Sequence, residues 1–150
     1  MSASERPLPV PDRDSLPWWK ALVRHELLLQ RCASCDALRW PPRELCNRCG
    51  TLDWTWIPAS GRGTVASWVV NHHMFGPGFR APYVVVAVRL DDQDDIVMPG
   101  AYWGSGDGTE DGADLAIGLP LEVDFDDIDV PSGSEPITLL RWRPARSMAP

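Results

Sequence analysis

Residues 32–49 read CASCDALRWPPRELCNRC, and this stretch contains all four cysteines of the chain. They form two C-x2-C pairs, Cys32 with Cys35 and Cys46 with Cys49, with ten residues between the pairs. Four thiolates at such a spacing are typical ligands of a structural zinc ion, which they surround as a tetrahedron. Because four protein ligands leave no position open for water or substrate, we expect this zinc to stabilise the fold and to take no part in catalysis.

Two disulfides or four free thiols are the alternatives for these cysteines. Asp36 follows the first pair and Gly50 follows the second, and both residue types tolerate the left-handed backbone that a metal-binding knuckle often needs. The N-terminal residues lack the apolar stretch of a secretory signal, so we expect a cytoplasmic, reducing location. Disulfides are rare in that setting, and zinc is therefore the favoured interpretation.

The residues around the two knuckles predict a rubredoxin-like zinc ribbon over residues 27–60. Residues 27–32 fit a strand that enters the first knuckle, and residues 38–40 fit the returning strand, which a pair of prolines ends. Residues 54–57 alternate like a third short strand. Residues 1–26 are predicted to form an extended, proline-containing arm followed by a short helix.

The predicted helix places two adjacent tryptophans near the N-terminus. A cap at residues 14–15 begins it, and Trp19, Leu22 and Val23 then fall on one face, with Trp18 beside them. This apolar face either packs on the body of the chain or docks onto a partner. Two adjacent tryptophans are a large anchor for a protein interface, although most aromatic faces belong to a core.

After residue 60 the sequence is typical of β-structure alone. Five strands are predicted, at residues 63–74, 83–90, 96–98, 121–125 and 137–142. A small antiparallel barrel closes five strands without exposed edges, and a five-stranded Greek-key barrel is the OB-fold. We therefore predict a mainly β protein with an OB-fold over residues 61–143 and a tail over residues 144–150.

The charge of the barrel half bears on nucleic-acid binding, because zinc-ribbon and OB-fold proteins often bind single strands. Residues 63–150 carry five Arg and fourteen Asp or Glu, a formal charge of −9. Such binding draws most of its strength from contacts of Lys and Arg with phosphates. We expect no nucleic-acid partner, and single-stranded nucleic-acid binding stays as an alternative function.

No catalytic set stands out in the sequence. The three histidines are His25, His72 and His73, and the last two are neighbours on a predicted strand, where side chains point to opposite faces. Zinc uses every cysteine, and the motifs of nucleophilic or phosphate-binding loops are missing. No run approaches the roughly 18 apolar residues of a membrane span. We expect a chain that is not an enzyme by itself and has no membrane partner.

A family resemblance covers roughly residues 15–143. The chain resembles the prokaryotic acyl-CoA-associated zinc-ribbon OB-fold proteins, which join an N-terminal helix and a rubredoxin-like ribbon to an OB-fold. One departure is Asp36, where the family usually has Gly. The shared landmarks, in order, are Leu29-Gln30-Arg31-Cys32-x-x-Cys35, Pro41-Pro42-Arg43-x-x-Cys46-x-x-Cys49-Gly50, Ser60-Gly61-x-Gly63-Thr64-Val65, the glycine-rich loop at residues 75–82, and Gly118-x-Pro120-Leu121-x-Val123-x-Phe125.

This resemblance implies an accessory subunit bound to a thiolase-like enzyme. Members resemble subunits that bridge an acetoacetyl-CoA thiolase and a hydroxymethylglutaryl-CoA synthase, or that pair with a thiolase-like aldolase cleaving the side chain of a steroid-CoA ester. High usage of Trp, Pro and Arg with little Lys favours the second type of partner. The resemblance thus implies a zinc-containing subunit of an aldolase complex, a heterotetramer on an enzyme dimer, with a bridging or acyl-CoA-binding role as the alternative.

The loop at residues 74–80 is the candidate contact on the barrel. Phe75, Phe79 and Arg80 lie there among glycines and a proline, a composition that suits a projecting recognition loop, although packing of both rings in the core is the alternative. We expect this loop and the two helix tryptophans to contact the partner. Arg62 or Arg80 is expected to meet the phosphates of coenzyme A.

Overall fold

The computed structural model describes residues 7–104 and 110–146. The first six residues of the predicted arm and the last four of the predicted tail therefore lie outside the described residues. Residues 7–12 contain no helix or strand, in agreement with an extended arm. Helix α1 follows at Leu16–Val23 and is the one α-helix in the described ranges.

A three-stranded antiparallel sheet forms the ribbon, in the order β2-β1-β3. Its strands are β1 (Leu28–Cys32), β2 (Leu38–Arg39) and β3 (Trp54–Pro58), close to the predicted positions. The central strand β1 pairs with β3 along its whole length, from Leu28 opposite Pro58 to Cys32 opposite Trp54. The strand therefore delivers Cys32 to the edge of a rigid sheet, where the first knuckle begins.

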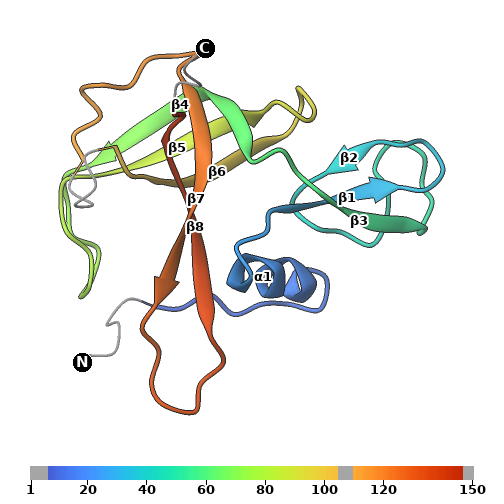
Figure 1. Cartoon of the computed structure of the whole chain (residues 1–150), viewed down its shortest axis with the longest axis horizontal. Helices are drawn as coiled ribbons and strands as arrows, with labels where there is room; N and C mark the ends of the chain where they lie inside the picture. The colour runs from blue at the N-terminus through green and yellow to red at the C-terminus, as the bar shows by residue number, and fades with distance from the viewer. Residues whose placement is uncertain (1–6, 105–109, 147–150) are drawn as a thin grey trace.

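The remaining strands close a five-stranded barrel in the order β4-β5-β6-β8-β7. Figure 1 shows this barrel beside the ribbon, with α1 lying beneath both. The prediction of a mainly β protein with a helix, a zinc ribbon and a five-stranded barrel is confirmed. The barrel strands are β4 (Arg62–Asn71), β5 (Tyr83–Leu90), β6 (Val97–Tyr102), β7 (Pro120–Ile128) and β8 (Ile137–Pro144).

Alternating side chains of the strands fill the barrel. In β5, Val84, Val86, Val88 and Leu90 are buried, whereas the residues between them are more accessible. Period-two burial is what a strand with one face on a core requires. Trp142 of β8 lies among these residues and is the largest fully buried side chain described.

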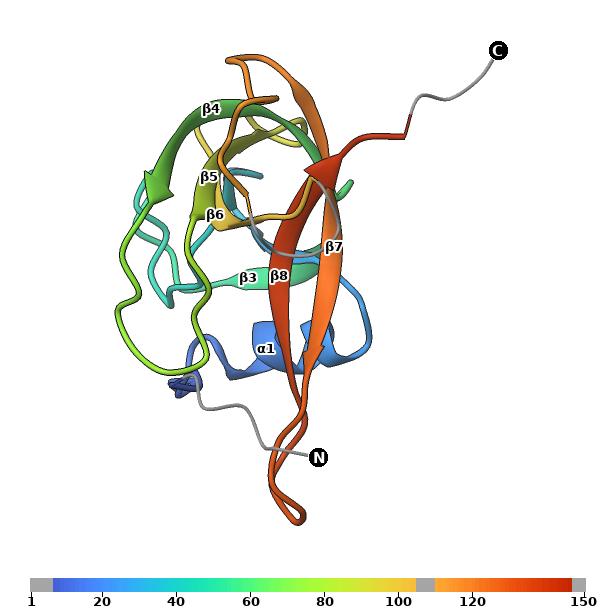
Figure 2. The ribbon, with the colours of Figure 1, turned by 90° about the vertical axis from the view of Figure 1, so that its left-hand side faces the viewer.

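The barrel wall is weakest between β6 and β8. These two strands are parallel and pair only at Ala101 with Arg141 and at Tyr102 with Trp142. By contrast, β7 and β8 pair from Leu121 opposite Pro144 to Ile128 opposite Ile137. Figure 2 shows the long β7–β8 hairpin extending past α1, which packs against β8. Residues 97–100 of β6 and residues 137–140 of β8 therefore do not pair with each other.

Two strand predictions were wrong. Strand β6 continues through Pro99 and Gly100 to Tyr102, beyond the predicted end at residue 98, because a strand with a partner on one side tolerates a residue without an N–H. Strand β4 ends at Asn71, so His72 and His73 lie beyond it and both are exposed, instead of pointing to opposite strand faces.

The helix also differs from its prediction. Ser15 occupies the N-cap position, but its side chain makes no capping hydrogen bond, because its hydroxyl donates to the carboxylate of Asp12. The buried face consists of Trp18, Ala21 and Leu22, whereas Trp19 is only partly buried. The tryptophan on the buried face of the helix is therefore Trp18, and not Trp19 as predicted.

Candidate functional site

The four cysteine sulfurs come together at one end of the ribbon. All four Sγ atoms lie within 4.8 Å of one another, with 3.6 Å between Cys32 and Cys49 and 3.7 Å between Cys35 and Cys46. Sulfurs bound to one zinc at about 2.3 Å are about 3.8 Å apart in a tetrahedron, whereas a disulfide holds them at about 2.0 Å. The geometry fits a single tetrahedral zinc and excludes disulfides.

Backbone N–H groups prepare the thiols for a metal. The backbone N–H groups of Cys49 and Arg48 lower the pKa of the Cys46 thiol to about 6. The positive φ angles of Asp36 (59°) and Gly50 (76°) turn the backbone in each knuckle. The residues that follow both C-x2-C pairs therefore take the left-handed conformation that their types predicted.

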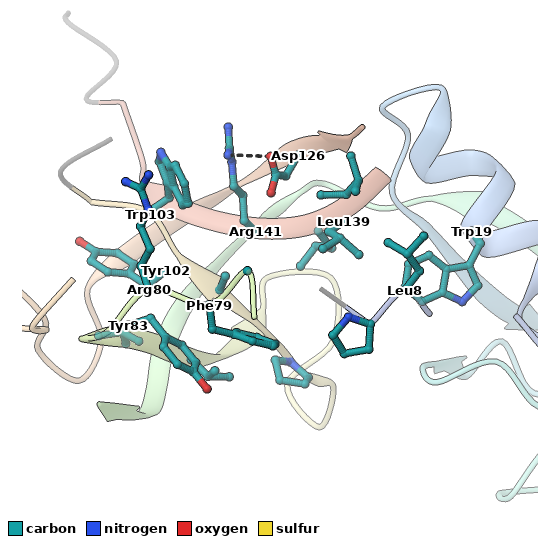
Figure 3. A pocket seen from close by; sticks show the side chains of 18 of the residues that line it. Leu8, Trp19, Phe79, Arg80, Tyr83, Tyr102, Trp103, Asp126, Leu139 and Arg141 are labelled. Atoms are coloured by element: carbon teal, nitrogen blue, oxygen red, sulfur yellow. Dashed lines mark hydrogen bonds and ion pairs between the residues drawn. The ribbon is translucent and has the colours of Figure 1, made fainter. Parts of the chain in front are cut away.

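An apolar groove of about 630 Å³ lies where β6 and β8 separate. Its walls come from the barrel, from α1, from the arm at Pro7 and Leu8, and from the loop before β5. Figure 3 shows Arg80 and Trp103 at one end of this groove and Leu8 and Trp19 at the other. The groove is thus elongated and joins segments that are far apart in the sequence.

The groove collects four of the six predicted contact residues. Trp18, Trp19, Phe79 and Arg80 line it. Trp18 is only 6% exposed, so it supports the groove wall and offers little area to a partner. Phe79 is partly buried, with its ring centroid 5.8 Å from that of Tyr83, which corrects the expectation that it projects from the loop.

The other two predicted residues lie apart from the groove. Phe75 is 69% exposed and has its ring edge against His73, so it is the projecting aromatic of the loop. Arg62 begins β4, where it lies opposite Glu122 of β7. The sequence could not separate these two residues from Phe79 and Arg80, because the separation depends on how the loop folds back over the barrel.

Sequence reasoning missed the side chains that the far strands bring to the groove. Trp103 follows β6, and Leu139 and Arg141 come from β8. The guanidinium of Arg141 lies 4.4 Å from the ring centroid of Trp103. Arg141 was the one signal in the sequence for this part of the groove, because a charged residue within a predicted barrel strand needs partners.

The charges along the groove are unevenly paired. Arg141 Nε donates to Asp124 at 2.5 Å, and its Nη1 contacts Asp126 at 3.2 Å. Arg143 on the same strand donates to Glu122 at 2.9 Å. Arg80 is exposed and has no carboxylate partner in the described part of the chain. Arg80 is therefore the groove cation that is available to an anion.

The described residues that line the groove include no Ser, Thr, Cys or His. Tyr102 in the groove donates to Asp114 at 2.5 Å, and burial together with this bond raises the pKa of its hydroxyl. The one histidine that pairs with a carboxylate, His25, contacts Asp127 at 3.0 Å on the outer surface. In the same described ranges, no helix has the length and apolarity to cross a membrane.

Two family descriptions match the chain in sequence order. Residues 19–55 match "ChsH2, rubredoxin-like zinc ribbon domain", and residues 56–126 match "ChsH2, C-terminal OB-fold domain". Together with the clustered thiols, the first match confirms the predicted zinc cofactor.

Two solved structures are similar over most of the chain. A chain of the "Ltp2-ChsH2(DUF35) aldolase" matches with a TM-score of 0.75 and 33% identity, and the alignment covers 91% of this chain and 98% of that chain. A DUF35 protein of unknown function from Sulfolobus solfataricus has a TM-score of 0.59 and 12% identity over 89% of this chain and 86% of its own, which shows the fold alone.

Two curated relatives are similar over parts of their lengths. The "Probable enoyl-CoA hydratase alpha subunit" of Thermomonospora curvata is 44% identical over 58% of this chain and 27% of that protein. The "3-oxo-4,17-pregnadiene-20-carboxyl-CoA hydratase alpha subunit" of Mycobacterium tuberculosis is 34% identical over 91% of this chain and 39% of that protein. The chain therefore spans less than half the length of the curated relatives it matches.

Proposed function

Because this chain belongs to the ChsH2 family of zinc-ribbon and OB-fold proteins, we propose that it is a non-catalytic subunit that binds and supports a thiolase-like enzyme acting on acyl-CoA. The proposed partner is an aldolase that cleaves the side chain of a steroid-CoA ester by a retro-aldol reaction. The likeness to a chain of the Ltp2-ChsH2(DUF35) aldolase carries this proposal, because it extends over 98% of that chain.

The names of the curated relatives support the substrate class. The Mycobacterium tuberculosis relative is named for the CoA ester of a steroid acid. This chain aligns with 39% of that relative, so the hydratase activity of the whole protein is not attributed to it. Among the described residues, the groove lining presents a tyrosine bound to Asp114 and arginines, and no Ser, Thr, Cys or His, which supports a non-catalytic role.

Each predicted site residue has a role in this proposal. Cys32, Cys35, Cys46 and Cys49 each give one thiolate to a single structural zinc ion. Trp19 and the loop aromatics form the surface that meets the enzyme, and Trp18 supports the ring of Trp19. Arg62 or Arg80 meets the phosphates of coenzyme A as a fixed positive charge. The proposed contact residues are Trp18, Trp19, Arg62, Phe75, Phe79 and Arg80.

The proposal extends to assembly and location. Two copies of the chain bind one enzyme dimer, because most enzyme dimers have two-fold symmetry and present the same surface twice. The complex works in the cytoplasm, where zinc thiolates stay reduced. We also propose residues 1–26, 27–60, 61–143 and 144–150 as the successive units of the chain.

Co-expression with a thiolase-like aldolase tests the proposal. We expect the two chains to elute together in size-exclusion chromatography at micromolar concentration, with the mass of two copies of each. Separate elution would contradict the accessory role. Tight binding of single-stranded DNA at physiological salt would instead favour nucleic-acid binding, which the ion pairs of Arg141 and Arg143 with carboxylates make unfavourable.

A matched pair of loop variants locates the surface. Phe79 lines the groove and Phe75 projects from the same loop, so Phe79→Ala and Phe75→Ala test the two faces separately. We expect the replacement that lies at the interface to raise the Kd of the complex about tenfold, which is about 1.4 kcal/mol. Zinc content and Tm should stay unchanged. A lower Tm for Phe79→Ala with an intact complex would mean that this ring only packs.

A further inference from the structure

We propose that the groove of this chain is itself a ligand site for a rigid polycyclic acid, one with an anionic group at one end and an oxygen acceptor at the other. Keto steroid carboxylates and their thioesters belong to this chemical class. The proposal rests on the proposed function only for the choice of this probe. The volume of about 630 Å³ falls within the roughly 300–1,000 Å³ of small-molecule sites.

The walls of the groove suit a rigid ring system. Phe79 and Tyr83 form one side with their rings, and Leu139 of β8 forms another. Trp19 lies at the far end, where its ring meets Trp18 edge to face with 5.1 Å between centroids. A rigid ligand loses less conformational entropy on binding than a flexible acyl chain of the same area. The aromatic walls therefore favour fused rings over an alkyl chain.

One end of the groove offers a cation. Arg141 is already neutralised by Asp124 and Asp126, whereas Arg80 has no carboxylate partner in the described ranges. Figure 3 places Arg80 beside Trp103 at this end. A ligand carboxylate or phosphate at Arg80 would form a charge-assisted hydrogen bond. The anionic end of the ligand is therefore assigned to Arg80.

The other end offers hydrogen-bond donors. Trp18 and Trp40 both line the groove, and their ring centroids are 5.9 Å apart. The indole nitrogens of both are buried and have no acceptor among the described residues. An indole N–H can only donate, and a buried donor without an acceptor is unfavourable. A ligand oxygen that reaches either nitrogen removes this penalty, so a keto group is assigned to this end.

Calorimetric titration of the full chain with three steroids tests the proposal. The probes are a 3-oxo steroid carboxylic acid, the same acid without the ring oxygen, and a neutral 3-oxo steroid. We expect the keto acid to bind most tightly, and Arg80→Gln to weaken the two acids about tenfold while leaving the neutral steroid unchanged. Arg89→Gln removes an exposed cation of the barrel outside the groove and is expected to change none of the three.

A second pair of variants tests the donor end. Trp40→Phe keeps the aromatic ring and removes the N–H, so it is expected to weaken the keto acid and to leave the acid without the ring oxygen unchanged. Trp54→Phe, in the ribbon and outside the groove, is the control. Zinc content and melting temperature confirm that each variant folds.

Three outcomes would overturn the proposal. They are no heat signal with the keto acid up to its solubility limit, equal losses for Arg80→Gln and Arg89→Gln, and equally tight binding of palmitate, a flexible acid titrated for comparison. Equal effects of Trp40→Phe on both acids would also contradict the assigned orientation. Because the titration uses no enzyme, ligand binding without complex formation would refute the accessory role alone, and the reverse would refute the ligand site alone.

Discussion

Gln93 in the β5–β6 turn of the barrel pairs with Leu38 of the ribbon strand β2 as if its side chain were a neighbouring peptide. The backbone N–H of Leu38 donates to Gln93 Oε1 at 2.8 Å, and Gln93 Nε2 donates to the Leu38 carbonyl at 2.9 Å. Arg48 and Asp95 add an ion pair between the same two regions at 2.6 Å. The turn therefore docks the ribbon on the barrel through the otherwise free edge of β2.

Replacing Gln93 by Ala is expected to lower the free energy of unfolding by about 1–2 kcal/mol, because the two hydrogen bonds to Leu38 and one to Asp95 are lost. Chemical denaturation of the zinc-loaded chain measures this. Asp94→Ala, in the same turn but without a side-chain bond in the described ranges, is the control and should have a smaller effect. Equal effects of the two replacements would show that the turn does not dock the ribbon.

Zinc removal is expected to unfold the ribbon, because the metal is the main cross-link between the two knuckles. Native mass spectrometry should find one zinc per chain, and a thiol-modifying reagent should release one equivalent. Cys46→Ser should lose the metal and melt at a lower temperature. A metal-free chain that melts cooperatively at the temperature of the zinc-loaded chain would contradict this prediction.

Gly63 is expected to tolerate no side chain. A Cβ at this position would lie 2.3 Å from the backbone carbonyl oxygen of Arg89 on the paired strand β5, which cannot move without breaking the ladder. Gly63→Ala should therefore destabilise the barrel by about 1–3 kcal/mol. Gly76→Ala is the control, because no atom lies within 4 Å of its added Cβ. Thermal melts of the two zinc-loaded variants measure this difference in stability.

The contact between His25 and Asp127 gives a pH-dependent contribution to stability. The hydroxyl of Thr138 and then the imidazole of His25 lower the pKa of Asp127 below its usual value. A carboxyl with a lowered pKa in the folded chain stabilises it above the unfolded pKa of about 3.9, and this contribution disappears as the pH falls through the folded pKa. Asp127 therefore stabilises the chain at neutral pH and not in acid.

Thermal melts of Asp127→Asn and the parent chain between pH 7 and pH 3 check this prediction. We expect the variant to melt at a lower temperature at pH 7 and the difference to shrink below about pH 4. Asp129→Asn, at a nearby exposed carboxylate, should show no such trend. A constant difference across the range would mean that Asp127 acts only through its shape.

Most of the fold was predictable because it depends on local patterns. The spacing of the cysteines indicated the ribbon, and alternation in Tyr83–Leu90 indicated a barrel strand at its observed bounds. The groove was not predictable from these patterns. It depends on the parting of β6 and β8 and on Arg141 reaching Trp103, and both are long-range relationships that leave no periodic signal.

The central claim is that the chain acts by binding a thiolase-like aldolase. Its most direct test is retro-aldol turnover of a steroid-CoA ester by the purified enzyme, measured with increasing amounts of this chain. We predict no turnover by the chain alone and a rise in enzyme activity that saturates at one copy per enzyme subunit. Turnover that does not change with added chain, while the two proteins elute separately, would contradict the account.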